Sequence, residues 1–572
     1  MKDRYPAGST IPAHCLVPED LQPDYTAAEA YGVDDTANVG WWLSDRQVRA
    51  GAGAEVAAVH AGTGQAWTYT DLAQASTALA KRLVRAGVQP GDRVALRSPN
   101  VPEALVAAIA VWKAGGVVVP TPVQSRPDEL AYFLSDTAAS MVLVIGGRAV
   151  VEDVLPVLQG DLTALAYGAG SEDSGLPPAM GRPDDAGDDD VVLPQVPSDS
   201  VAIVWHTGGT TGVPKSCYHT HRRFLLGGHA VAEALRPRPG QRWAAAAPLG
   251  HALGFIYHTI FTVLHGATVV LIEDFRDPDA VLDALVEHRV DTFTAIMATW
   301  ARMLDALDSR PRELPDLSHG YAMWQTASSS AVRERWLDRG IELRNNYGST
   351  AFATWPLAPR SGEPVPPTSL GRPLPGYTVR AVTAEAGVVR LLESGPGQMA
   401  VRGLTGLTYW NRAELQARDV IDGWTLCDDL IDFDEGGNAA YLGRTDYLIS
   451  SAGYKIAPTE VEQVLSEHPA VREVAVVGAP DALRQEIVVA FVALHPRETP
   501  GEDMARELQQ LVKSRLSPYK YPRRVHFVDA LPRDTVGKVR AGVVKSWVTD
   551  GVPTAAASPE QPPSRTASGG HP

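Results

Sequence analysis

Apolar residues recur along the first quarter of the chain in two alternating patterns. Leucines and alanines at helical spacing over residues 72–83 are followed, after a turn, by a short run at residues 93–96 that is apolar after Arg93. Two further pairs of this kind continue the alternation to residue 145. A period near 3.6 indicates an amphipathic helix, and a short continuous apolar run indicates a strand buried on both faces. The alternation predicts parallel βαβ units and therefore an α/β fold.

A loop rich in glycine and threonine follows the buried strand that is predicted at residues 201–205. Glycines let the backbone turn tightly and approach a ligand, while threonine hydroxyls and free backbone N–H groups form a concave anion-binding nest. Lys215 adds a positive charge at the end of the loop. Pro214 has no N–H, so the loop differs from the GxxxxGK(S/T) phosphate loop. We predict that the loop binds phosphate rather than forming an ordinary surface turn, through Thr207, Gly208, Gly209, Thr210, Thr211 and Gly212.

Beyond this loop the α/β pattern continues and then changes character. Strands are expected at residues 242–246 and 268–272, with a helix at 279–288. Short valine-rich segments separated by turns over residues 378–402 predict a smaller β-rich subdomain. Residues 168–197 are acidic and rich in glycine, and we interpret them as a mobile surface loop within the large domain.

A second unit is predicted from residue 444 onward. A capping box over Thr459–Glu462 begins a helix, and two strands are expected at residues 473–477 and 487–492. The last residues are rich in proline, alanine and serine, which is typical of a disordered tail. We therefore predict a large α/β domain with a β-rich subdomain at residues 1–443, a small mobile α+β domain at 444–548 and a disordered tail at 549–572.

Composition limits the classes of partner. The chain has 572 residues, more than one hydrophobic core normally holds, and its net charge of −16 argues against a nucleic-acid or membrane-surface partner. Three cysteines, Cys15, Cys217 and Cys427, lie far apart, so neither a disulfide framework nor a metal site is expected. No leader or apolar run of about 18 residues is evident. We expect a soluble, cytoplasmic protein.

Several motifs resemble, in order, those of the adenylate-forming superfamily of acyl-CoA synthetases, adenylation domains and luciferases. The loop at residues 207–215 is similar to that family's phosphate-binding signature, and Pro248–His251 resembles the next motif, in which His251 would gate the acyl site. Residues 450–457 and 517–523 are most similar to benzoate- and 2-aminobenzoate-CoA ligases. The family's adenylate motif is matched by Asn346, Tyr347, Gly348, Ser349 and Thr350.

The C-terminal third carries the remaining motifs. Asp429 and Arg444, 15 residues apart, resemble the ribose-binding pair. Residues 445–460 resemble the interdomain hinge and the loop after it, with Asp446 at the pivot. Residues 531–538 resemble the segment that bears the catalytic lysine, which would be Lys538.

The resemblance implies ATP-dependent activation of an aryl acid through an acyl-adenylate, followed by transfer to CoA, with ATP, Mg²⁺ and CoA required. Lys538 would neutralise charge between the carboxylate and the α-phosphate, and Lys215 would contact the leaving pyrophosphate. Tyr347 would stack on adenine, and Asp429 would accept the ribose hydroxyls. Without the resemblance, each of these residues could be an ordinary surface or core residue.

Three positions depart from the family pattern. Ala351 replaces a glutamate that helps to hold Mg²⁺, Asp428 replaces a glycine before the ribose aspartate, and residues 326–328, including Ser328, replace a glycine-rich stretch at the adenine. The missing carboxylate leaves alternatives open. They are activation of nitrite to diazotise an arylamine, acyl transfer to a carrier protein or an amine, and, from another class, a non-catalytic nucleotide-binding module.

Overall fold

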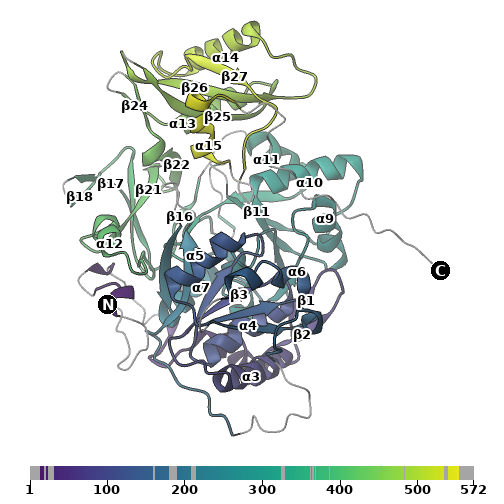
Figure 1. Ribbon diagram of the computed structural model, residues 1–572. Helices are drawn as coiled ribbons and strands as arrows, with labels where there is room; N and C mark the ends of the chain where they lie inside the picture. The colour runs from purple at the N-terminus through teal and green to yellow at the C-terminus, as the bar shows by residue number, and fades with distance from the viewer. Residues whose placement is uncertain are drawn as a thin grey trace. The chain divides into compact units, whose positions relative to one another are not determined.

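The polypeptide divides into two units between Asp446 and Tyr447. Figure 1 shows this computed structural model and labels many of its helices and strands. The structure describes residues 13–18, 21–23, 31–158, 162–179, 190–207, 214–323, 329–360, 362–363, 366, 369–385, 387–451, 454–481, 483–533 and 539–552. The acidic segment at 180–189 and the tail from 553 lie outside these ranges, so the predictions of a mobile loop and a disordered tail are not tested there.

Two mainly parallel sheets form the centre of the large unit. The first has the order β6-β5-β3-β4-β7-β8, in which only the last pair is antiparallel. Its strands are β3 (Arg93–Arg97), β4 (Val117–Thr121), β5 (Met141–Ile145), β6 (Thr163–Tyr167), β7 (Val201–Thr207) and β8 (Lys215–Thr220).

The second sheet has the order β13-β12-β11-β9-β10-β1-β2, again with one antiparallel pair at its edge. Its strands are β1 (Val56–His60), β2 (Ala66–Thr68), β9 (Arg242–Ala245), β10 (Thr268–Leu271), β11 (Thr292–Ile296), β12 (His319–Met323) and β13 (Glu342–Asn345).

Helix α4 (Pro102–Lys113) joins the two sheets because it contacts β1 of one and β3, β4 and β5 of the other. It is apolar nearly all round, as expected for a helix enclosed by protein. The other helices of this unit are α1 (Val39–Leu43), α2 (Asp45–Gln47), α3 (Tyr69–Arg85), α5 (Pro127–Thr137), α6 (Arg148–Val151), α7 (His221–Leu235), α8 (Ala252–His258), α9 (Pro278–Glu287), α10 (Met297–Ser309), α11 (Ser329–Leu337) and α12 (Ala413–Asp419).

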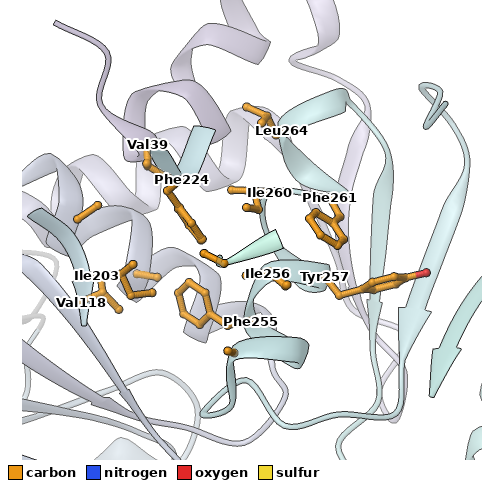
Figure 2. Close-up of a cluster of buried hydrophobic side chains, with 14 of the residues drawn as sticks. Val39, Val118, Ile203, Phe224, Phe255, Ile256, Tyr257, Ile260, Phe261 and Leu264 are labelled. Carbon is orange, nitrogen blue, oxygen red and sulfur yellow. The ribbon is translucent and has the colours of Figure 1, made fainter. Parts of the chain in front are cut away.

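One apolar cluster connects helices α7 and α8 to the first sheet. Figure 2 shows Phe224 of α7 and Phe255 of α8 gathered with Val118 of β4 and Ile203 of β7. The two phenylalanine rings are 6.4 Å apart. Because such a core is densely packed, it holds α7 and α8 rigidly against the strands that precede the candidate site.

Two smaller antiparallel sheets make up the β-rich part of the large unit. One joins β14 (Tyr347–Ser349), β15 (Thr354–Ala358) and β16 (Arg372–Pro373). The other contains β17 (Thr378–Glu385), β18 (Val388–Leu391), β19 (Gly397–Arg402), β20 (Val420–Ile421), β21 (Trp424–Phe433) and β22 (Ala439–Arg444).

The small unit is a sheet with apolar clusters on both faces, one with α13 and α14 and the other with α15. Its strands are β23 (Ile449–Ser451), β24 (Tyr454–Ile456), β25 (Val471–Asp481), β26 (Gln485–Leu494) and β27 (Arg524–Phe527), and its helices are α13 (Pro458–Ser466), α14 (Glu502–Arg515) and α15 (Ala541–Asp550). The predicted fold class is confirmed by this architecture. Among the helices that the structure describes, none has the length and apolar character needed to cross a bilayer.

The structure corrects three details of the sequence analysis. Residues 215–220 form strand β8, which was not predicted. The sequence also predicts a turn at 345–350, where glycine and serine follow two asparagines, but this stretch contains strand β14. Helix α13 is capped by Glu460, whose carboxylate accepts a hydrogen bond from the backbone N–H of Ala457 at 3.1 Å. Glu462, the glutamate of the predicted capping box, instead turns toward β25 and accepts a hydrogen bond from the N–H of Val476 at 2.8 Å.

The inward position of Glu462 predicts a pH-dependent stability of the small unit. Burial raises the pKa of Glu462 from 4.5 to about 7. Because the folded pKa is raised, the protonated form is favoured on folding, and this stabilisation is lost as the pH rises through about 7. Glu462→Gln should therefore make the small unit more stable than the wild type by roughly 1–3 kcal/mol at pH 8, with the difference disappearing near pH 5.

Hydrogen exchange of α13 and β25 in the full-length protein, corrected for intrinsic exchange rates, measures this difference. Glu502→Gln is the matched control because the side chain of Glu502 is 95% exposed. Parallel pH profiles for the wild type and Glu462→Gln would contradict the prediction.

Candidate functional site

The predicted phosphate loop connects the antiparallel strands β7 and β8. Thr207, the last residue of β7, is paired in register with Lys215, the first residue of β8. Lys215 is half-buried. The side chain of Thr207 lies outside the described part of the structure, as do Gly208, Gly209, Thr210, Thr211 and Gly212. Their phosphate-binding role therefore stays a prediction, but the strand pairing fixes both ends of the segment that carries them.

Strand β8 also supports the adenylate motif at residues 346–350. The imidazole Nε2 of His219 lies 3.0 Å from the carbonyl oxygen of Thr350, and the Cys217 thiol donates to the same oxygen at 3.6 Å. Burial, and then the nearby charge of Arg223, lower the pKa of His219 to about 3, so the ring is neutral. Since a carbonyl oxygen only accepts, Nε2 carries the proton. Side chains alternate along a strand, so Lys215 lies on the same face of β8 as these two residues.

Tyr347 and Asp429 form a buried polar contact in the candidate site. The Tyr347 hydroxyl donates to Asp429 Oδ2 at 2.5 Å, and the Tyr441 hydroxyl donates to Oδ1 at 3.2 Å. Burial raises the pKa of Asp429, while the bond from Tyr347 and the charge of Arg444 oppose the rise. Burial and the adjacent carboxylate raise the pKa of Tyr347 far above its usual value, so the proton stays on the phenol.

Asp429 and Arg444 are cross-strand partners in the hairpin of β21 and β22. The chain between these two residues therefore forms a hairpin, which places them opposite each other. Arg444 Nη2, however, donates to Asp428 Oδ2 at 3.0 Å, whereas Arg444 Nη1 lies 4.0 Å from Asp429 Oδ1. Asp428, which departs from the family pattern, thus binds the guanidinium more closely than the predicted ribose aspartate does.

Beside Tyr347, one feature fits a nucleotide base and a second restricts which residue the motif can hold. The amide of Asn346 is only 2% exposed, yet neither its oxygen nor its nitrogen has a hydrogen-bond partner among the described residues. A buried amide without a partner costs about 1–3 kcal/mol, and its paired donor and acceptor match the edge of a base. A side chain at Gly348 would meet Trp355, since a Cβ there would lie 2.6 Å from Cδ1 of the indole. The motif consequently packs too tightly to admit another residue at Gly348.

Mg²⁺ fits this region as part of a nucleotide complex. The described residues contain no group of three or more histidine, cysteine, aspartate or glutamate side chains placed to hold a metal. Ala351 is half-buried against the core. Mg²⁺ in phosphoryl-transfer sites keeps several waters and uses substrate phosphates with one or two carboxylates, so no protein cage is needed.

His251 sits at the start of α8, where its Nδ1 accepts a hydrogen bond from the N–H of Leu253 at 3.3 Å. The preceding turn packs closely on the chain after β4, because a Cβ on Gly250 would lie 2.4 Å from the Cα of Pro122. Asn100 fixes the same turn, since its Oδ1 accepts from the N–H of Leu249 at 2.8 Å. The imidazole is thus presented from a rigid turn.

The remaining predicted residues cannot be placed. Ser328 and Lys538 lie outside the described residues, and the side chain of Asp446 does too, although its backbone lies in a short 3₁₀ turn at Thr445–Tyr447. Their roles stay predictions.

Three polar residues of the site were not found from the sequence. They are Asn100, His219 and Tyr441, and each makes a hydrogen bond to a segment far away in the chain or across a hairpin. Only His219 had a usable signal, since it lies four residues after Lys215 and so on the same face of a strand.

Comparisons with known proteins place these features in context. Residues 45–410 match the family described as AMP-binding enzyme, and residues 460–538 match the AMP-binding enzyme C-terminal domain. The chain is 29% identical over 530 residues to the acyl-coenzyme A synthetase ACSM5, mitochondrial, of Homo sapiens, covering 88% of this chain and 86% of that protein. It is 30% identical over 526 residues to the benzoate–CoA ligase of Thauera aromatica, covering 88% and 95%.

A solved structure has the same fold. The anthranilate CoA ligase AuaEII in complex with anthranoyl-AMP superposes with a TM-score of 0.80 at 22% identity, covering 91% of this chain and 99% of the other.

The contact between Arg444 and Asp428 leads to a prediction for ATP affinity. Asp428→Asn should release Arg444 toward Asp429 and remove a negative charge beside the predicted ribose-binding pair. Because ion pairs at partly exposed sites contribute about 0.2–1 kcal/mol, we expect the KM for ATP to fall roughly 1.5- to 5-fold with little change in kcat.

Initial rates at varied ATP measure this effect. Asp432→Asn is the control. It removes a carboxylate from the same strand, but this carboxylate accepts a hydrogen bond from the N–H of Phe433. An unchanged or higher KM in Asp428→Asn would show that Asp428 does not restrain Arg444.

Proposed function

This chain belongs to the family of AMP-binding enzymes, and we propose that it activates an aromatic carboxylic acid of the benzoate or aminobenzoate type and transfers it to CoA. The family resemblance drawn from the motifs is confirmed. The protein is an ATP-dependent, AMP-forming ligase that joins a small-molecule acid to a thiol and uses ATP, Mg²⁺ and CoA. A non-catalytic nucleotide-binding module is thereby set aside.

The grouping of Tyr347, Asp429 and Arg444 carries the proposal for the nucleotide site. These residues come from β14, β21 and β22, and a buried carboxylate with hydrogen-bonded phenols is suited to accepting ribose hydroxyls. Asn346 would pair with the base, and the ring of Tyr347 would cover it. The hydrogen bond between His219 of β8 and the carbonyl oxygen of Thr350 supports a position of Lys215 near the phosphates of the same nucleotide.

The reaction requires two nucleophilic substitutions. A carboxylate oxygen attacks the α-phosphorus of ATP, and the bond to pyrophosphate breaks; the CoA thiolate then attacks the carbonyl carbon, and AMP leaves. Two anions must meet in the first step, so positive groups and orientation supply most of the catalysis. We assign Lys538 to the carboxylate and α-phosphate, and Lys215 to the pyrophosphate. Asp446 would act as the hinge between the half-reactions, and His251 would gate the acyl pocket.

The aromatic substrate class is the finer part of the proposal. Its support is the similarity of residues 450–457 and 517–523 to aryl-CoA ligases and the 30% identity with benzoate–CoA ligase over most of both chains. The comparable identity with an acyl-coenzyme A synthetase makes aliphatic acids the necessary comparison.

Ala351 favours a second candidate. Without the glutamate that usually helps to hold Mg²⁺, the metal-assisted chemistry differs from the family pattern, and we keep activation of nitrite, with an arylamine as the acceptor, as the second candidate. A carrier-protein thiol or an amine is also an acceptor consistent with the same first step.

A pyrophosphate-release screen tests the substrate class. We expect release to depend on benzoates or aminobenzoates with kcat/KM at least about tenfold above that for alkanoates of four to eight carbons, because a pocket shaped for a ring discriminates by packing. AMP and aryl-CoA should then form in equal amounts when CoA is present. Preference for alkanoates would overturn the aromatic assignment, and release that requires nitrite with an arylamine would establish the second candidate.

Lys538 should serve only the first half-reaction. Lys538→Ala should lower acid-dependent pyrophosphate release by about 100-fold or more, as expected when a group that stabilises transition-state charge is removed. Thioester formation from supplied aroyl-AMP and CoA should stay within about threefold of the wild type. Lys545→Ala is the control, because this lysine of α15 is 51% exposed and its ion pair with Glu486 is long, at 3.7 Å. Loss of both half-reactions in Lys538→Ala would refute the assignment.

A further inference from the structure

Both neighbours of Lys215 in the chain are held by helix α5. The hydroxyl of Tyr132 donates to the carbonyl oxygen of Pro214 at 2.7 Å. The hydroxyl of Ser216 donates to Oδ2 of Asp136. Tyr132 and Asp136 are four residues apart and so lie on one face of the helix. The backbone immediately before and immediately after the lysine is therefore fixed by one rigid element.

Arg412 completes this network. Its Nη2 donates to Oδ1 of Asp136 and lies 3.4 Å from the hydroxyl of Tyr132. The side chain of Asp136 is only 7% exposed, and each of its oxygens has a partner, which is the condition under which a buried carboxylate is tolerated. The segment that carries Arg412 is itself attached to β8, because the N–H of Trp410 donates to the carbonyl oxygen of Ser216 at 2.8 Å.

His206 lies beside this network but makes no hydrogen bond to its described residues. It is the cross-strand partner of Ser216, and its ring centroid lies 4.1 Å from that of Phe133 on α5. Burial lowers the pKa of His206 to about 4, with the charge of Asp136 opposing, so the imidazole is neutral at physiological pH. Neither ring nitrogen has a hydrogen-bond partner among the described residues, so Asp136 keeps Ser216 and Arg412 as its partners.

We propose that Tyr132, Asp136 and Arg412 are positioning residues that set the direction of Lys215 for its contact with the pyrophosphate. A lysine side chain has four rotatable bonds, and its starting direction is fixed by the backbone on either side. A misplacement of about 1 Å at a charge-stabilising group can cost about 100-fold in rate. The inference rests on the proposed role of Lys215, and nothing in it depends on whether the acid is aromatic.

The double variant Tyr132→Phe/Ser216→Ala removes both bonds from α5 and leaves the charged pair of Asp136 and Arg412 in place. We expect kcat/KM for ATP in pyrophosphate release to fall roughly 10- to 100-fold. Thioester formation from supplied acyl-AMP should stay within about twofold, since it does not use the pyrophosphate contact. The acid in this assay is whichever one the wild type activates best.

A mutant cycle with Lys215→Ala separates positioning from general stabilisation. If the network acts through Lys215, then Tyr132→Phe/Ser216→Ala should cause no further loss in the Lys215→Ala background. Tyr69→Phe is the matched control, because it removes a tyrosine hydroxyl on α3 that donates to a backbone carbonyl oxygen, that of Ala267 at 2.9 Å, away from β8. It should leave both half-reactions unchanged.

Three results would decide against the inference. They are wild-type ATP kinetics in the double variant, a parallel fall of both half-reactions, and multiplicative losses with Lys215→Ala. The single variant Tyr132→Phe, which deletes one oxygen, supplies the same readouts if the double variant folds poorly. If Lys215→Ala itself leaves pyrophosphate release unchanged, the proposed role of Lys215 fails, which is a separate outcome from a failure of the network.

Discussion

Strand β8 is the constraint on which the candidate site depends. One edge pairs with β7, and the other bonds to residues 408–410 through the N–H of Tyr218 and the carbonyl oxygen of Ser216. One face holds Thr350 through Cys217 and His219, while the other reaches Asp136 through Ser216. With both edges and both faces occupied, the strand cannot shift register without breaking contacts to all four neighbours. The backbone position of Lys215, the first residue of β8, is therefore fixed by that strand.

Buried carboxylates are the second requirement of the site. Asp136 is satisfied by Ser216 and Arg412, and Asp429 by two phenols with Arg444 nearby. Removing one hydrogen-bond partner from such a group costs about 1–3 kcal/mol, because a buried polar atom is left unsatisfied. These groups therefore contribute little net stability, but they hold donors and acceptors in fixed directions before a ligand arrives. Rigid presentation of this kind is what an enzyme that joins two anions needs.

The sequence predicted the elements whose residues are uniformly apolar, and it failed where buried residues are polar. Strand β5 ends where the predicted alternation ends, at residue 145, because Met141–Ile145 is continuously hydrophobic. Strand β8 was missed because it contains serine, histidine and threonine, which are buried only because α5 and residues 350 and 408 supply partners. Likewise, Glu460 and Glu462 both suit a helix start, and only the packing of α13 on β25 decides which one turns inward. Motifs located the candidate residues, but tertiary contacts decide their partners.

The hairpin of β21 and β22 shows how the pairing of two motif residues is kept although the residue before one of them differs from the family pattern. Alternation along β21 makes Asp428 exposed and Asp429 buried, so an aspartate in place of glycine at 428 adds a surface side chain without disturbing the inner face. The pairing of Asp429 with Arg444 depends on backbone register, which a side chain at 428 does not alter. The aspartate at 428 instead gives the guanidinium of Arg444 a second carboxylate partner, because Arg444 Nη2 lies 3.0 Å from Asp428 Oδ2. The substitution therefore acts on the charge of Arg444 at the proposed ribose site and leaves the backbone pairing that positions this residue intact.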